Sequence, residues 1–222
     1  MLFERWEERD DLRPIDNIDR ARSCDIARCR SKRLLDVLLG GIALLMFLPL
    51  LALAAAAIWL ETGQPIFFRQ QRTGHQGRVF TILKFRTMTV LEDGSSISQA
   101  RRGDARVTRV GWLLRRMSID ELPQLINVLS GEMSLVGPRP HAIAHDREFQ
   151  RKVPTYAQRF RAKPGITGLA QVNGLRGEII GDSAIILRTA ADNRYIETWS
   201  LATDIRILAK TAVLMFHDPR AF

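Results

Sequence analysis

An uninterrupted apolar run from Val37 to Leu60 constrains this chain more than any other feature. At about 1.5 Å per helical residue, the run is long enough to cross the hydrocarbon core of a membrane. Pro49 stands near its centre, where the proline ring removes one backbone hydrogen bond and favours a kink. Each arm would then reach only partway into the bilayer. We therefore expect a re-entrant helical hairpin over residues 32–61, broken at Pro49.

Basic residues stand on both sides of this run. Because Lys and Arg favour the cytoplasmic flank of a membrane segment, we expect both ends of the hairpin, and both termini, in the cytoplasm. The alternative is a single span that tolerates Pro49 and translocates the C-terminal part, since long domains can cross regardless of charge. The flanking basic residues are Arg20, Arg22, Arg28, Arg30, Lys32 and Arg33 before the run, and Arg69, Arg72, Arg78, Lys84 and Arg86 after it.

The remaining sequence predicts one further domain. The chain has 222 residues, 46% of them hydrophobic, and its formal net charge of +9 lies entirely after residue 60. Such a balance suits anionic lipid headgroups, phosphorylated substrates or nucleic acid, and composition does not choose among them. Residues 1–31 are predicted to be a charged, mobile leader, and residues 62–222 the main domain. Cys24 and Cys29 lack a second pair, so free thiols are expected rather than a zinc site.

Periodicity predicts a helix-rich α/β fold of the α+β type. Two short strands, Pro65–Gln71 and Val79–Met88, are expected around a Gly-containing turn, and a helical pattern begins at Val107. Residues 200–216 read as an amphipathic helix, whose apolar stripe packs on the domain or lies in a membrane interface. This stripe comprises Leu201, Ile205, Leu208, Ala212 and Met215.

The acidic pair Asp120–Glu121 is the strongest chemical signal. Ser118 and Glu121 fit a capping box, which would make the pair purely structural. Against this, a carboxylate beside so many cations can hold Mg²⁺ near a bound phosphate or attack phosphorus itself. We expect the cations to keep Asp120 ionised. The surrounding arginines are Arg101, Arg102, Arg106, Arg109, Arg115, Arg116 and Arg139.

Between Lys32 and Met215 the chain resembles the bacterial monotopic phosphoglycosyl transferases, the polyprenol-phosphate sugar-1-phosphate transferase family. The resemblance implies that a UDP-sugar donates its sugar-1-phosphate to undecaprenyl phosphate, releasing UMP, at the cytoplasmic face of the bacterial inner membrane. It also implies a re-entrant helix broken at a proline, which matches Pro49. The motifs that carry it are KRLLD, PIFFRQQRTG, FTILKFRTM, DARVTRVGWLLRRMSIDELPQLINVLSGEMSLVGPRP, KPGITGLAQVNG and RYIETWS.

The same resemblance implies roles for individual residues. Asp120 corresponds to the nucleophile that carries a covalent phosphosugar and ligates Mg²⁺, and Glu121 to its partner. Basic motif positions are expected to bind substrate phosphates, and these are Lys84, Arg86, Arg115 and Arg139.

The sequence leaves alternatives for Arg176, for the histidine pair and for the function. Leu175 separates QVNG from Arg176, so Arg176 supplies a displaced phosphate-binding cation, in a pattern similar to the hexose-1-phosphate branch of exopolysaccharide synthesis that uses glucose or galactose. His141 and His145 are spaced as metal ligands, although histidines at such spacing are more often structural. A membrane-tethered nucleic-acid binder and a noncatalytic assembly scaffold are the competing functions, of which the first lacks a recognisable nucleic-acid motif. A homo-oligomer is among the partners that the sequence allows.

Overall fold

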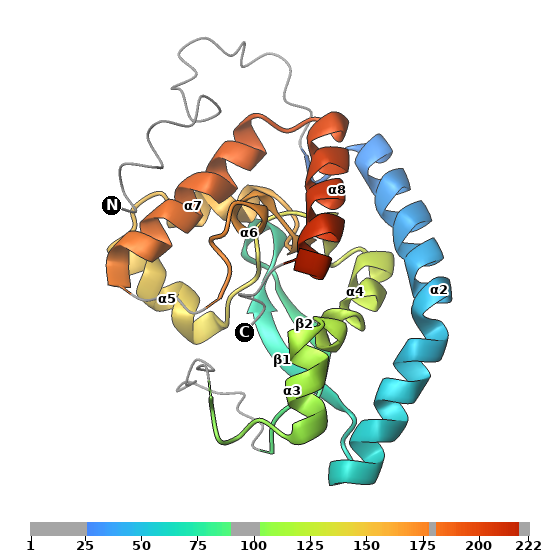
Figure 1. Cartoon of the computed structure of the whole chain (residues 1–222). Helices are drawn as coiled ribbons and strands as arrows, with labels where there is room; N and C mark the ends of the chain where they lie inside the picture. Colours follow the sequence, from blue (N-terminus) through green and yellow to red (C-terminus); the bar gives the residue numbers. More distant parts are fainter. Residues whose placement is uncertain (1–25, 90–102, 178–180, 218–222) are drawn as a thin grey trace.

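A computed structural model describes residues 26–89, 103–177 and 181–217 and confirms a helix-rich fold with small sheets (Figure 1). The predicted leader lies mostly outside the described residues. The elements are α2 (Arg30–Thr62), β1 (Phe67–Thr73), η3 (His75–Gly77), β2 (Val79–Phe85), α3 (Arg109–Arg116), η4 (Ile119–Glu121), α4 (Gln124–Ser130), β3 (Ser134–Val136), α5 (Ile143–Lys152), η5 (Tyr156–Arg161), β4 (Gly165–Thr167), α6 (Leu169–Val172), α7 (Gly181–Glu197) and α8 (Leu201–His217).

The predicted hairpin is present. Strands β1 and β2 pair antiparallel, from Phe67 opposite Phe85 to Thr73 opposite Val79. Phe80 and Ile82 of β2 are buried, as alternating side chains on one face of a strand require. They pack with residues of α4, β3, α7 and α8 in the largest hydrophobic cluster, so the hairpin forms one wall of the core.

Two glycine-containing segments meet in a second sheet. Strands β3 and β4 pair parallel, with Ser134 opposite Gly165. A Cβ atom at Gly165 would lie 2.1 Å from the backbone nitrogen of Gly137, and one at Gly168 would lie 2.3 Å from its carbonyl oxygen. These approaches exclude any side chain. The backbones of the sequence motifs VGPRP and KPGITG are therefore in direct contact, and this contact positions the loop that follows β3.

Helix α2 is continuous through Pro49. It changes direction about midway along its length in Figure 1, but the predicted break and re-entrant hairpin are not observed. Proline removes only one backbone hydrogen bond, and the turns on both sides of it are fastened to the domain, so the helix bends without ending. Leu45 and Leu60, on opposite sides of Pro49, are 74% and 76% exposed. An apolar face along α2 is thus left without protein contacts.

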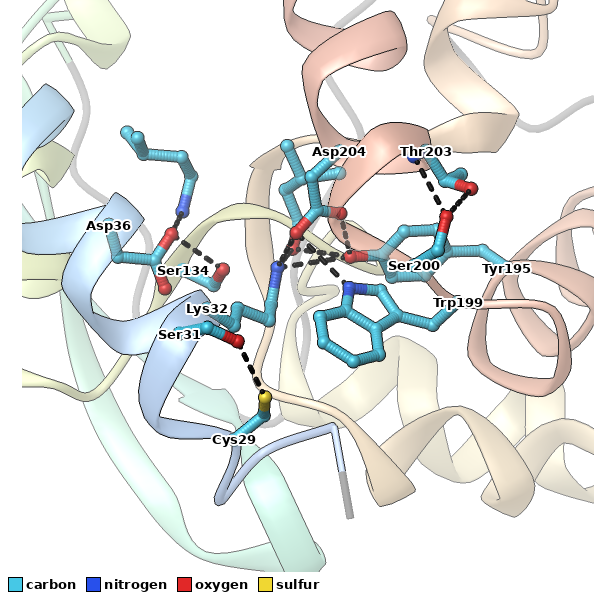
Figure 2. A network of polar contacts seen from close by, with 12 residues as sticks. Cys29, Ser31, Lys32, Asp36, Ser134, Tyr195, Trp199, Ser200, Thr203 and Asp204 are labelled. Carbon is cyan, nitrogen blue, oxygen red and sulfur yellow. Dashed lines mark hydrogen bonds and ion pairs between the residues drawn. The ribbon is translucent and has the colours of Figure 1, made fainter. Parts of the chain in front are cut away.

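The first arm of α2 is anchored by buried charges (Figure 2). The ammonium group of Lys32 lies 2.7 Å from a carboxylate oxygen of Asp204 and donates to the hydroxyl of Tyr195 and the carbonyl of Val136. Asp36 accepts hydrogen bonds from the hydroxyl of Ser134 and the backbone of Leu135. Since all three protons of Lys32 have acceptors, the network offsets much of the cost of burying its charge.

The second arm is anchored by apolar contacts and by helix caps. Ala54 and Ile58 pack in a cluster with Leu114 of α3. The carboxylate of Glu61 accepts hydrogen bonds from the first backbone N–H groups of α3. Such groups lack intrahelical partners, so the end of α2 caps the start of α3. Both arms of α2 therefore contact the same domain.

The C-terminal helix α8 confirms the predicted element, although its buried face differs. Asp204 and Ile207 are buried, whereas Ile205 of the predicted apolar stripe, which was expected either on the domain or in a membrane interface, is 56% exposed. The ion pair of Asp204 with Lys32 thus lies on the buried face of α8.

We expect Asp204→Ala to lower the free energy of unfolding by about 3 to 5 kcal/mol, because Lys32 would stay buried without its counter-charge. Asp182→Ala is the matched control, since Asp182 pairs with Lys152 at the surface, where ion pairs contribute little. Thermal unfolding followed by circular dichroism measures both variants. Equal midpoints would show that the buried pair does not anchor α2.

Candidate functional site

The acidic pair lies in a short turn of its own. Asp120 and Glu121 belong to η4, between α3 and α4, and both are buried. Ser118, just before this turn, adopts a left-handed backbone conformation with φ of 56°. Its hydroxyl does not cap the turn but accepts a hydrogen bond from Arg176 at 2.7 Å. The capping-box alternative is therefore wrong, because a left-handed residue does not have the extended backbone of an N-cap.

Glu121 forms ion pairs with two cations of the site. Its carboxylate lies 2.7 Å from the ammonium of Lys84 on β2 and accepts two hydrogen bonds from the guanidinium of Arg139, which follows β3. Burial alone would raise the pKa of Glu121, but Arg139 and Lys84 outweigh it and hold that pKa well below its usual range. Burial in turn lowers the pKa of Lys84, against the opposing effect of Glu121. Glu121 is thus a permanent anion.

Asp120 has the opposite environment. Its carboxylate makes no hydrogen bond or ion pair with any residue that the structure describes. Burial and the neighbouring charge of Glu121 raise the pKa of Asp120 to about 6, although Lys84, Arg115 and Arg139 act to lower it. The expectation that cations hold Asp120 ionised is thus only partly met, because they pair with its neighbour. At neutral pH Asp120 is mostly ionised, and its oxygens are available to a ligand.

The predicted basic residues separate into three groups. Lys84 and Arg139 contact Glu121 directly, and Arg115 is close enough to act on the pKa of Asp120. Arg176 reaches the site through Ser118. Arg86 donates instead to the hydroxyl of Thr62 and to the carbonyls of residues 63 and 64, just after α2. These contacts favour a structural role for Arg86, and its phosphate contact stays a prediction.

A buried polar cluster behind Arg139 was not anticipated from the sequence. Arg159 of η5 donates to the backbone carbonyl of Arg139 at 2.6 Å and pairs with Asp192 of α7 at 2.7 Å. It also contacts His141 at 2.8 Å, and Arg188 of α7 is buried in the same region. The spacing of Arg188 and Asp192, four residues apart on one helix, was a readable signal for a shared helix face.

The histidine pair does not form a metal site. His141 precedes α5, so it does not share a helical face with His145, and its ring lies against Tyr156. Among the described residues no group of three His, Cys, Asp or Glu side chains is placed to hold a metal ion. The structural alternative for His141 is the one observed.

Comparison with known proteins identifies close relatives. The family described as bacterial sugar transferase matches residues 27–218. A UDP-glucose:undecaprenyl-phosphate glucose-1-phosphate transferase of Caulobacter vibrioides is 53% identical over 191 residues, covering 86% of this chain and 72% of that protein. An Escherichia coli protein of the same name is 44% identical over 191 residues, again 86% of this chain but 41% of its own length. The exopolysaccharide production protein PSS of Rhizobium leguminosarum is 42% identical over 82% of this chain and 93% of its own.

We expect Asp120→Asn to gain stability relative to the wild type as pH rises. Because the pKa of Asp120 is raised from 3.8 to about 6, the folded state favours its protonated form. The associated stabilisation is complete below about pH 4 and is lost as pH rises through about 6, amounting to about 3 kcal/mol. Asn stays neutral throughout and avoids this loss. Thermal unfolding midpoints measured from pH 4 to 8 test the difference.

Glu121→Gln is the matched control with the opposite sign. The lowered pKa of Glu121 stabilises the fold above the unfolded pKa, and this contribution is lost as pH falls through the folded value. The variant should therefore be least stable, relative to the wild type, at neutral pH. The same pH dependence for both variants would contradict the separate environments of the two carboxylates.

Proposed function

The chain belongs to the bacterial sugar transferase family, and we propose that it transfers hexose-1-phosphate from a UDP-sugar to undecaprenyl phosphate, releasing UMP. The names of the relatives support these substrates, and the relative from Rhizobium supports a role in exopolysaccharide production. The observation that carries the proposal is the buried Asp120 carboxylate, which has no hydrogen-bond or ion-pair partner in the described part of the chain and lies beside an anion that pairs with two cations.

In the proposed mechanism Asp120 is the nucleophile. One of its oxygens attacks the sugar-bearing phosphorus, forming an acyl phosphate while the phosphorus–oxygen bond to UMP breaks. The phosphate oxygen of the lipid then attacks the same phosphorus, the bond to Asp120 breaks, and the carboxylate is restored. Donor and acceptor are both anions, so two successive displacements let one electropositive site receive each in turn. Burial, without a hydrogen bond from the described residues, leaves the Asp120 carboxylate poorly solvated, which favours its attack on phosphorus.

Glu121 acts in this scheme as a positioning residue. By pairing with both Lys84 and Arg139, Glu121 offsets part of the cost of burying these two cations beside Asp120. Their positions are then set before substrate binds, which is the condition for electrostatic stabilisation of a charged transition state. Arg115 adds to the same field. A substrate diphosphate can share the unused hydrogen-bonding protons of these side chains.

The donor set fits Mg²⁺, which commonly binds through one or two carboxylates together with substrate phosphates. We propose that Asp120 holds the ion, because Lys84 and Arg139 already occupy the oxygens of Glu121. When bound, Mg²⁺ would offset the negative charge of the diphosphate.

We propose glucose as the sugar, with galactose as the alternative. Two of the relatives named above carry glucose in their names. Arg176 departs from the motif pattern by one position, and it contacts the turn that carries Asp120 through Ser118. Its guanidinium is therefore placed to act on the site, although no described contact reaches the sugar position itself.

The packing of α2 supports a monotopic arrangement, with both ends of α2 on the cytoplasmic side. By length and composition α2 could cross a membrane. Lys32 and Ile58, from opposite arms, are nevertheless both buried against the same domain. A straight span would draw this charged domain into the hydrocarbon core, at a high cost in free energy. We propose that α2 lies in one leaflet, with its exposed apolar face in lipid.

Helix α3 extends the proposed lipid contact. It packs beside the second arm of α2, and its Trp112 and Leu113 are about half exposed. The guanidinium of Arg116 lies over the Trp112 ring. A tryptophan next to a basic residue is typical of the membrane interface, where anionic headgroups and acyl chains meet. Anionic lipids of the inner membrane are the proposed partners of this face.

Asp120→Asn should abolish transfer, lowering the rate by at least about a thousandfold, since the nucleophile is lost. The assay combines radiolabelled UDP-glucose or UDP-galactose, undecaprenyl phosphate and Mg²⁺, and measures lipid-linked label and UMP. Asp182→Asn, an exposed change on α7, is the control and should retain activity. Mass spectrometry of the quenched wild type should find one hexose phosphate on Asp120. Retained turnover in Asp120→Asn would remove the covalent mechanism.

Thiol tags at the two termini should both report the cytoplasm, because both arms of α2 return to the same domain. Cys24 and Cys29 are first replaced by Ser so that only the tags react. In intact spheroplasts a membrane-impermeant reagent should label neither tag, and in lysed cells it should label both. Labelling of the C-terminal tag alone in spheroplasts would replace the monotopic arrangement with a span.

A further inference from the structure

The polar cluster behind Arg139 is organised around Arg159. This side chain donates to the backbone carbonyl of Arg139, to the ring of His141 and to the hydroxyl of Tyr156, and it pairs with Asp192. Tyr156 in turn donates to Asp146. Arg159 is therefore fully engaged, and it connects the cluster directly to the loop that carries Arg139.

Arg188 is a buried cation that forms no ion pair with the residues that the structure describes, although the charge of Asp192 acts on it. It is 6% exposed and donates one hydrogen bond, to the carbonyl of Gly177 at 3.2 Å. Its Nε atom is buried without a partner. Asp192, one turn further along α7, is taken by Arg159. Burial, with repulsion from Arg139, lowers the pKa of Arg188 to about 10, so the side chain stays charged at neutral pH. A buried charge of this kind is costly unless an anion joins it.

His141 presents a second unused donor to this region. The guanidinium of Arg159 always donates, so Nδ1 of His141, at 2.8 Å, must accept. Burial and the nearby arginines, Arg188 among them, hold the pKa of His141 well below its usual range, so the ring is neutral. Its single proton then resides on Nε2, which is buried and has no partner. Such an unsatisfied donor costs free energy until an acceptor binds.

We propose that Arg188 and His141 bind the phosphate that leaves on UMP, while Asp120 attacks the neighbouring sugar-bearing phosphorus. This inference rests on the proposed function and assigns a subsite to one half of its substrate. Arg139 connects the two positions. Its guanidinium pairs with Glu121, the neighbour of Asp120 in the sequence, and its backbone carbonyl accepts a hydrogen bond from Arg159 of the cluster. The two phosphates of a diphosphate are adjacent, as this placement requires.

The position of Arg188 favours the nucleotide over the lipid as the source of this phosphate. The C-terminal end of α7 contacts α2 through Tyr195, whereas the start of α7 lies on the opposite side of the domain from α2 (Figure 1), and Arg188 is in the part of α7 before Tyr195. The lipid substrate would approach from the apolar face of α2, whereas a soluble nucleotide can reach the opposite side. A phosphate bound by Arg188 therefore belongs to UMP and not to undecaprenyl phosphate.

Binding of UMP and of uridine, measured by calorimetry without turnover, tests the subsite. In Arg188→Gln the affinity for UMP should fall about ten- to hundredfold, as expected for loss of a charge-assisted contact, while the affinity for uridine is unchanged. Arg161→Gln, at an exposed arginine, is the control and should alter neither affinity. Arg188→Lys keeps the charge and should recover part of the UMP affinity, and it replaces Arg188→Gln if circular dichroism shows that the latter does not fold.

Two variants at His141 distinguish the contributions of its two ring nitrogens to UMP binding. Asn places an acceptor near the position of Nδ1 and lacks the Nε2 donor, so His141→Asn should weaken UMP binding. Gln extends a donor toward the position of Nε2, so His141→Gln should retain more of the affinity. The reverse order would remove His141 from the subsite.

Steady-state kinetics distinguish the two phosphates. Arg188→Gln should raise the KM for the UDP-sugar and leave the KM for undecaprenyl phosphate unchanged. A raised KM for the lipid alone would overturn the assignment. An unchanged preference for UMP over uridine in Arg188→Gln, with transfer intact, would overturn the subsite and leave the proposed function standing. Failure of the wild type both to bind UMP and to transfer sugar phosphate would remove both.

Discussion

The carboxylate of Glu121 is the interaction on which the rest of the site depends. It brings together three segments distant in sequence, because Lys84 lies on β2, Glu121 in η4 and Arg139 after β3. Two buried cations beside each other would repel, and Glu121 makes their proximity tolerable. Its second effect falls on Asp120, whose pKa it raises by adding negative charge. By pairing with Lys84 and Arg139, the Glu121 side chain thus holds both cations in the site and leaves neither of them as an ion-pair partner of Asp120.

Backbone contacts of the loop after β3 stabilise this arrangement. Gly137 and Gly165 approach so closely that no side chain fits between them, and the contact holds the loop after β3. Arg159 then fixes the carbonyl of Arg139. Val136, just before this loop, accepts a hydrogen bond from Lys32 at the start of α2. The start of α2 and the arginine that pairs with Glu121 are therefore parts of one hydrogen-bonded structure.

This connection also gives the KRLLD motif a physical meaning. Lys32 bonds Asp204 and Tyr195, and Asp36 binds β3 (Figure 2). Arg33 donates to the carbonyls of Val128 and Leu129 in α4. A basic flank of an apolar segment usually binds lipid headgroups. Here these charges form contacts within the protein, which explains how the first arm of an exposed apolar helix stays attached to the domain.

The sequence by itself determined the elements and the chemistry that depends on local pattern. Alternation predicted the β1–β2 hairpin, and periodicity predicted the C-terminal helix. The acidic pair and the motifs of the family resemblance pointed to Asp120, Glu121, Lys84 and Arg139, which the structure brings together and whose catalytic roles stay predictions. Only the tertiary structure decided which carboxylate the cations neutralise, that Arg86 binds the end of α2, that α2 passes through Pro49, and that Arg188 lies buried near Arg139. Local pattern reports which residues share a face, whereas burial and long-range charge pairing depend on segments that meet only in the folded chain.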